Sequence, residues 1–249
     1  MQRVLSYMRR AVDDYNLIAD GDRIAVGVSG GKDSVLLLSA LNALRRFYGK
    51  EFSIVGITLD MGFDEGSDFS PLREYFDGLG IEYHVKETQI GQIVFNARQE
   101  DSPCSLCARM RRGALHGAAK EMGANKLALG HHFDDVVDTF MLALMHEGRI
   151  GTLSPVTYLD RRDITVIRPL IYMPEKDVAY FVRRNPGLPV RPSLCPEDKH
   201  TERETVKRML DSLDRADKGL KHRIFGAIQK AGVDGFKEAG MEKREYEEN

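Results

Sequence analysis

Two adjacent glycines followed by Lys32-Asp33-Ser34 lie between two apolar runs, in the stretch GVSGGKDSVLLL that spans residues 27–38. Glycine has no Cβ, so the backbone can approach an anion closely. N–H groups at the start of a helix attract that anion, and the helix dipole adds partial positive charge. Lys32 adds a full charge. The stretch therefore predicts a loop that binds a polyphosphate.

The loop departs from the Walker A sequence, G-x-x-x-x-G-K-[ST]. Asp33 follows the lysine where Walker A has Ser or Thr, and Val26 stands where its first glycine would be. A carboxylate here repels phosphate unless Mg²⁺ intervenes or the carboxylate orders the loop. An ordinary glycine-rich turn between a strand and a helix is the alternative. The glycines, the lysine and the helix start favour a polyphosphate-binding loop that is not a Walker A loop.

Three cysteines form a second candidate site: Cys104, Cys107 and Cys195. An odd number argues against a disulfide framework. Two cysteines three residues apart can share a metal, and a helix start favours thiolates. The residues alone leave four alternatives open: inert buried thiols, a redox pair, structural zinc with a fourth ligand such as His200, and an iron–sulfur cluster with one open iron.

A third polar cluster is GHHFDD at residues 130–135. Two histidines and two aspartates suggest a site for iron or zinc. The alternative for His132 is that it caps the following helix or faces solvent. Asp60, at the end of an apolar run, is a further candidate, and its alternative role is that of a turn residue.

These residues need a scaffold, and the apolar pattern predicts one. Short apolar runs predict five strands at 23–29, 52–61, 81–86, 126–130 and 164–171. Between and after them, helical periodicity appears at 34–47, 71–79, 107–122, 133–146 and 175–184. The alternation predicts an α/β fold with a doubly wound, mostly parallel five-stranded sheet, plus N- and C-terminal helices at 2–18 and 201–230. Ligands of such sheets bind at the carboxyl ends of the strands. The residues from Ser29 onward, Asp60 and the segment 131–135 are expected there, after the first, second and fourth strands.

The expected organisation has four segments along the chain. They are an N-terminal helix at 1–22, a domain carrying the polyphosphate loop and the Cys-x-x-Cys helix at 23–190, a loop with the third cysteine and helices at 191–236, and a polar tail at 237–249.

The composition is that of a globular protein of 249 residues with a formal net charge of −2 and a pI near 6.4. A strongly basic body is excluded, but a nucleic-acid partner is not, because binding depends on where the charge lies. The N-terminus has no apolar run suited to a signal peptide or membrane anchor. We expect a cytoplasmic protein with no membrane partner.

Five stretches together resemble the tRNA 2-thiocytidine synthetase family of PP-loop ATP pyrophosphatases. They are YNLIADGDRIAVGVSGGKDS, PCSLCARMRRGAL, LALGHHFDD, VIRPLIYMPEKDV and RPSLCPEDKHTERETVKRML, and the resemblance runs from about residue 15 to residue 230. One departure is visible, because the family often has a second Cys-x-x-Cys around its late cysteine. Here Pro192 and Ser193 stand where the extra cysteine might be.

The resemblance implies a PP-loop fold and cleavage of ATP between its α- and β-phosphates, with transfer of AMP to a substrate oxygen. Its cofactors would be ATP, Mg²⁺ and a [4Fe–4S] cluster on Cys104, Cys107 and Cys195. The catalytic candidates are Lys32, Asp60, Asp135 and Arg111. Arg111 is included because it lies one helical turn after Cys107, and its alternative is a place on a solvated helix face. The ATP-binding residues would be Ser29, Gly30, Gly31, Lys32, Asp33, Ser34, Asp60, Gly130 and Asp135.

The implied reaction is replacement of the C2 oxygen of a tRNA cytidine by sulfur. The same chemistry on another base or a free nucleobase, a cluster-dependent desulfurase and a nucleotide-binding redox sensor are alternatives. The implied partners are tRNA, a sulfur donor (a cysteine desulfurase or sulfide) and a second copy in a homodimer. Candidate RNA contacts are Arg109, Arg112, Arg183, Arg184, Lys207 and Arg208; further basic pairs, Arg161 with Arg162 and Lys221 with Arg223, are expected at the surface.

Overall fold

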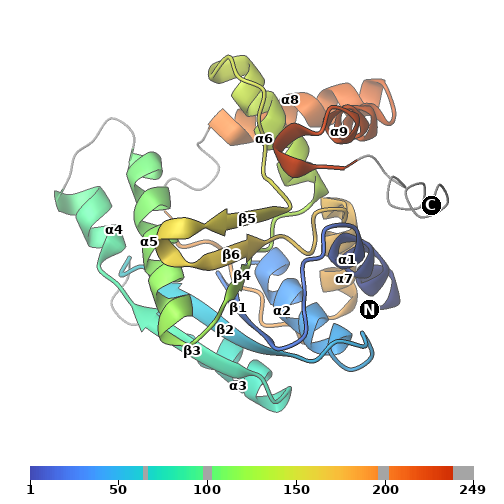
Figure 1. Ribbon diagram of the computed structural model, residues 1–249. Coiled ribbons are helices and arrows are strands. Elements are labelled where there is room, and N and C mark those ends of the chain that lie inside the picture. The colour runs from blue at the N-terminus through green and yellow to red at the C-terminus, as the bar shows by residue number, and fades with distance from the viewer. Residues whose placement is uncertain (64–66, 98–102, 196–201, 238–249) are drawn as a thin grey trace.

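The computed structural model describes residues 1–63, 67–97, 103–195 and 202–237. Its centre is a six-stranded sheet with the order β3-β2-β1-β4-β6-β5, in which only β5 is antiparallel to its neighbour (Figure 1). The strands are β1 (Asp22–Gly27), β2 (Phe52–Asp60), β3 (Glu82–Glu87), β4 (Lys126–Ala128), β5 (Val156–Leu159) and β6 (Ile164–Ile167). All five predicted strands are present. The sixth, β5, is short and half-exposed and was not predicted.

Helices join and cover these strands. They are α1 (Gln2–Asp14), α2 (Lys32–Leu44), α3 (Ser70–Gly78), α4 (Ile90–Gln92), the π-helix η1 (Ile93–Ala97), α5 (Pro103–Glu121), α6 (Phe133–His146), η2 (Asp160–Arg162), α7 (Glu175–Arg184), α8 (Glu202–Ala216), α9 (Leu220–Lys230) and η3 (Val233–Gly235). The expected helix at 201–230 is two helices, because Gly219 adopts φ +87° and reverses the chain. Residues 238–249 of the expected polar tail, and His200, lie outside the described part.

The strands alternate between two cores. Ile24 and Val26 of β1 pack in the larger core with α1, α2 and the C-terminal helices, whereas Ala25 faces the smaller core under α5. This period-two pattern is what a sheet buried on both faces requires. Figure 1 shows α5 on one face and α2 on the other.

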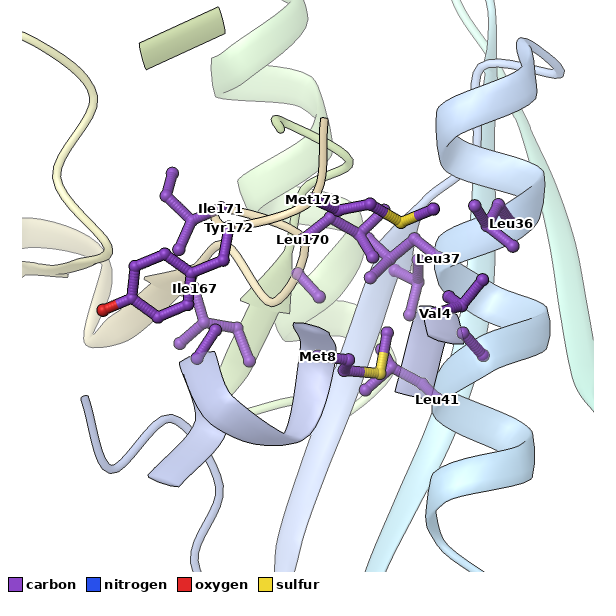
Figure 2. Packing of buried hydrophobic residues seen from close by; sticks show 14 of the residues in the cluster. Val4, Met8, Leu36, Leu37, Leu41, Ile167, Leu170, Ile171, Tyr172 and Met173 are labelled. Atoms are coloured by element: carbon purple, nitrogen blue, oxygen red, sulfur yellow. The ribbon is translucent and has the colours of Figure 1, made fainter. Parts of the chain in front are cut away.

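The segment after β6 holds α7 against the domain. Its residues 170–173, LIYM, are all buried. Figure 2 shows them in one cluster with side chains of α1, such as Met8, and of α2, such as Leu37. The predicted strand at 164–171 therefore ends at Ile167, and its last residues pack as an irregular strap. This strap fixes where α7 begins.

The strand order reverses at β1, which pairs in parallel with β2 on one side and β4 on the other. The chain runs outward from β1 through β2 and β3, then returns to β4 on the opposite side. The loops after β1 and β4 therefore leave the same edge in opposite directions and open a crevice. Residues 28–31 and 129–132 occupy that switch point.

Candidate active site

The glycine loop after β1 is shaped by its own two serines. Ser34 Oγ accepts a hydrogen bond from Ser29 N at 3.1 Å and donates to Gly31 O at 3.0 Å. Gly31 N donates to Ser29 Oγ at 3.3 Å. Gly30 has φ +82°, a conformation that other residues adopt only with strain. The loop thus holds its curvature through its own hydrogen bonds.

Gly130 lets the loop after β4 touch the glycine loop. A Cβ on Gly130 would lie 3.1 Å from the carbonyl carbon of Asp33 and 3.2 Å from Ser34 N. Both atoms belong to the backbone at the start of α2 and cannot swing aside. Any larger residue would push the two loops apart. Gly130 therefore allows the loop after β4 to pack closely on the glycine loop, besides the nucleotide contact expected of it.

Lys32 lies in a chain of alternating charges. Its Nζ is 3.0 Å from Asp33 Oδ2 and 3.0 Å from Glu175 Oε1 of α7, and Glu175 Oε2 is 2.8 Å from Lys207 Nζ of α8. Burial opposes the charged form of Glu175, but the hydrogen bonds and charges of Lys207 and Lys32 lower its pKa to about 2. One ionised carboxylate therefore joins the loop lysine to α8.

His132 caps α6, as its alternative interpretation predicted. Asp135 N donates to His132 Nδ1 at 3.4 Å, and His132 N donates to Asp135 Oδ2 at 2.9 Å, which completes a capping box. Although burial opposes ionisation, His132 and His131 hold the pKa of Asp135 below its usual value. Arg203 of α8 lies 3.4 Å from the other oxygen of Asp135.

The remaining members of GHHFDD also have partners within the fold. Asp134 accepts from Glu175 N at 2.7 Å and from Lys221 Nζ at 3.1 Å. Lys221, expected at the surface, is only 6% exposed and also pairs with Asp211 at 2.6 Å, so that expectation was wrong. Arg168 donates to His131 at 3.2 Å. Across the described ranges, no three His, Cys, Asp or Glu side chains converge as a metal-binding group, so these four residues do not form the suggested iron or zinc site.

A place for Mg²⁺ is indicated by Asp33. Its Oδ1 is buried, and none of the described residues gives it a hydrogen-bond donor. His132 Nε2 stands 3.7 Å away, beyond hydrogen-bond range. A buried carboxylate oxygen without a partner is costly, and a hard cation prefers such oxygens. The residue fits Mg²⁺ bound together with phosphate.

Asp60 ends β2, and its side chain makes a local turn. Its Oδ1 accepts from Gly62 N at 3.0 Å, and its backbone carbonyl accepts from Thr88 at 2.9 Å and 2.7 Å. These contacts agree with the alternative of a turn residue. Its part in ATP chemistry stays a prediction.

The three cysteines approach one another from α5 and the segment before residue 196. Cys104 is exposed, Cys107 is buried and Cys195 is half-buried. Burial raises the pKa of Cys107, the charge of neighbouring Arg111 lowers it, and Cys195 and Cys104 raise it further. Both other thiols and Arg111 therefore affect the pKa of Cys107. Cys195 does so although it lies 88 residues further along the sequence.

The donor set fits a four-iron cluster in type and number, with three thiols for three irons and one iron left open. As they stand, the thiols do not yet form a coordination group. Cys104 and Cys195 both affect the pKa of Cys107, and Cys104 is exposed. Binding of a cluster can therefore bring the three thiols into one coordination group.

Arg191 connects the third cysteine to the glycine loop. Its backbone N donates to Gly30 O at 2.9 Å, and its side chain donates to Asp68 O at 3.0 Å and lies over Phe69. A Cβ on Gly30 would come within 2.5 Å of the Arg191 side chain. Beside this contact is a cavity of about 330 Å³ between residues 68–72 and 189–194. Three residues separate Arg191 from Cys195, so the ATP loop and the cysteine segment are adjacent.

The candidate RNA contacts differ in their surroundings. Arg109, Arg112, Arg183, Arg184 and Arg208 are exposed, as an RNA interface requires. Lys207 is half-buried and its ammonium group is paired with Glu175. Through Glu175, which also pairs with Lys32, Lys207 is linked to the glycine loop.

Sequence reasoning missed Glu175, Arg191 and Arg203. Each lies in one of the quoted family-like stretches, which was the available signal. An acidic residue in the first turn of a helix has a sufficient local explanation in the helix dipole. Only the fold shows that Glu175 reaches Lys32.

The PP-loop domain family matches residues 4–188. The tRNA-cytidine(32) 2-sulfurtransferase of Teredinibacter turnerae is 39% identical over 234 residues, which cover 92% of this chain and 76% of the relative. The chain belongs to this family. The sulfurtransferase of the same name from Syntrophotalea carbinolica is 40% identical, over 88% of this chain and 85% of its own.

Solved structures agree on the fold of this sulfurtransferase family member. U34-tRNA thiolase NcsA from Methanococcus maripaludis, solved with its [4Fe-4S] cluster, superposes with a TM-score of 0.70 at 23% identity, over 92% of this chain and 78% of that one. Within the described ranges, no helix is long and apolar enough to cross a membrane.

Proposed function

We propose that the protein uses ATP to replace the C2 oxygen of cytidine 32 in tRNA with sulfur. The family supports the substrate, since its members carry the name tRNA-cytidine(32) 2-sulfurtransferase. One observation carries the proposal on the structural side: the hydrogen bond from Arg191 N to Gly30 O at 2.9 Å. It joins the ATP loop to the segment that bears Cys195, so activation and sulfur delivery share one site.

In the first half of the reaction, the cytidine O2 attacks the α-phosphorus of ATP, and pyrophosphate leaves. The backbone N–H groups at the start of α2 bind the phosphates, and Lys32 offsets charge that develops on the leaving group. Asp33, with its unpartnered oxygen, would hold Mg²⁺, which supplies further charge neutralisation. Asp60 ends β2 and Asp135 follows β4, at the same edge of the sheet.

In the second half, sulfur attacks C2 and AMP departs with the former O2. Cys104, Cys107 and Cys195 would hold a [4Fe–4S] cluster, whose contribution is an iron position that can carry sulfide. Arg111, which affects the pKa of Cys107, would offset negative charge near the thiolates. The cavity of about 330 Å³ beside Arg191 is large enough for an unstacked base.

The test is an anaerobic assay of the full chain reconstituted with iron and sulfide. We expect AMP, pyrophosphate and 2-thiocytidine to accumulate in equal amounts over many turnovers only when tRNA and sulfide are both present. A matched tRNA with uridine at position 32 should give no thiolated product. ATP binding without turnover would instead support a nucleotide-binding sensor, and thiolation without AMP would exclude the activation step.

The partners can be tested in the same assay. We propose that either free sulfide or a cysteine desulfurase with cysteine supplies sulfur, and that the protein acts as a homodimer. Replacing sulfide by the desulfurase, cysteine and a thiol that reduces the enzyme-bound persulfide to sulfide should sustain turnover, and light scattering should give twice the chain mass. A monomeric mass with full activity would refute the dimer.

A further inference from the structure

The glycine loop has more negative than positive side chains around its lysine. Lys32 contacts Asp33 and Glu175 at 3.0 Å each, and Asp135 lies across His132 from Asp33. This set holds one ammonium group and three carboxylates, of which Asp33 and Glu175 contact Lys32. A triphosphate entering such a site would be repelled, because low-dielectric surroundings strengthen repulsion between like charges. The site needs further cations.

Helix α8 supplies two cations to this set. Arg203 and Lys207 are four residues apart and so share one face of the helix. Lys207 Nζ is 2.8 Å from Glu175, and Arg203 is 3.4 Å from Asp135 and donates to Thr139 of α6. With them, three cations balance three carboxylates, before any magnesium is counted.

We propose that Arg203 and Lys207 form a second cationic wall of the ATP site and bind the phosphates opposite the glycine loop. This rests on the proposed ATP chemistry. Glu175 keeps Lys207 and Lys32 on either side of one carboxylate, and a phosphate oxygen that enters there can accept from both ammonium groups. Arg203 reaches the same space from the side of Asp135.

Two other roles for Lys207 predict different behaviour. As an RNA contact, it would face solvent, as Arg208 does on the same helix. As a purely structural ion pair, it would contribute to folding stability alone. The half-buried position of Lys207 and its shared carboxylate with the loop lysine favour the ATP site.

The test is affinity for α,β-methylene ATP with Mg²⁺, measured by titration calorimetry on the reconstituted full chain. We expect Lys207→Met and Arg203→Met each to weaken binding about tenfold, and Lys207→Arg to restore most of it. Arg215→Met is the matched control, since it removes one charge from the exposed end of α8, about 12 Å along the helix from Lys207. It should change the affinity less than twofold. Binding of tRNA without nucleotide should be unaffected by Lys207→Met.

Two results would overturn the proposal. If Lys207→Met weakens tRNA binding but matches Arg215→Met for the nucleotide, the residue belongs to the RNA interface. If both affinities are unchanged while the unfolding temperature falls, the residue makes only a structural ion pair. Failure of this proposal can be told apart from failure of the proposed tRNA thiolation, because nucleotide affinity is measured without tRNA or sulfur.

Discussion

The glycine loop and the three cysteines, the ATP half and the sulfur half of the proposed site, differ in how far the protein's own contacts order them. The glycine loop is closed by hydrogen bonds between Ser29, Gly31 and Ser34, and Lys32 is held by two carboxylates. The cysteines influence one another's ionisation, but they do not form a coordination group by themselves. The chain's own contacts shape the first half, whereas in the proposed function a bound cluster completes the second.

This difference follows from the chemistry of each ligand. ATP arrives and leaves in every cycle, so a preformed site avoids paying for ordering each time. A cluster is resident, and its binding can supply the free energy that orders its thiolates. The two halves should therefore respond differently to substitution.

The largest effect is expected in the sulfur half. Cys104→Ser should abolish 2-thiocytidine formation and lower the iron content, because one thiolate ligand is lost. Cys104 is exposed, so the fold should persist, and affinity for α,β-methylene ATP should stay within twofold. Iron analysis, nucleoside mass spectrometry and calorimetry measure these three quantities. The neighbouring Ser105→Ala is the control, and full iron content in Cys104→Ser would contradict the assignment.

The reciprocal change in the ATP half is Lys32→Met. We expect AMP formation to fall on the order of 10²–10³-fold, since a cation that offsets leaving-group charge is lost. Iron content should equal that of the unaltered protein, because Lys32 contacts Asp33 and Glu175 rather than the thiols. A rate within threefold of the original would show that α8 or Mg²⁺ suffices without the loop lysine.

The smallest effect is expected on stability, from Asp138 of α6. This residue is buried, and its Oδ1 has no hydrogen-bond partner among the described residues. Burial raises its pKa to about 6, although Lys221 opposes the rise. Between about pH 4 and pH 6 the unfolded carboxyl has lost its proton and the folded one keeps it, so stability falls as pH rises. Asp138→Asn should raise the free energy of unfolding by about 1–2 kcal/mol at pH 7.5 and change it little near pH 4.

Urea titrations at both pH values measure this difference. By contrast, Glu175 has a pKa near 2, and its contribution to stability should persist down to about pH 4 and be lost as pH falls toward 2. A gain for Asp138→Asn that is equal at pH 4 and pH 7.5 would refute the raised pKa.

Local patterns in the sequence predicted most of the scaffold. The helices at 133–146 and 175–184 were predicted with their observed ends, because periodicity, acidic residues in the first turn and basic residues in the last turn mark both. The strand β5 was missed, since a four-residue, half-exposed edge strand has little apolar signal. The break at Gly219 was also missed, because the periodicity resumes on its far side.

The site was predicted in its parts but not in its connections. Glycines and cysteines announce their chemistry by type and spacing. The pairing of Glu175 with both Lys32 and Lys207 depends on contacts between three helices that the sequence separates. Lys207 and Lys221 were expected at the surface for the same reason, since a lysine alone does not reveal a buried partner.

The central claim is that cytidine O2 is adenylated before sulfur replaces it. The most direct measurement uses tRNA whose cytidine 32 carries ¹⁸O at C2, followed by mass spectrometry of the AMP formed. If the account is right, AMP contains one ¹⁸O in its phosphate for each 2-thiocytidine made. If AMP carries no label while thiolation proceeds, ATP activates some other group and the account is wrong.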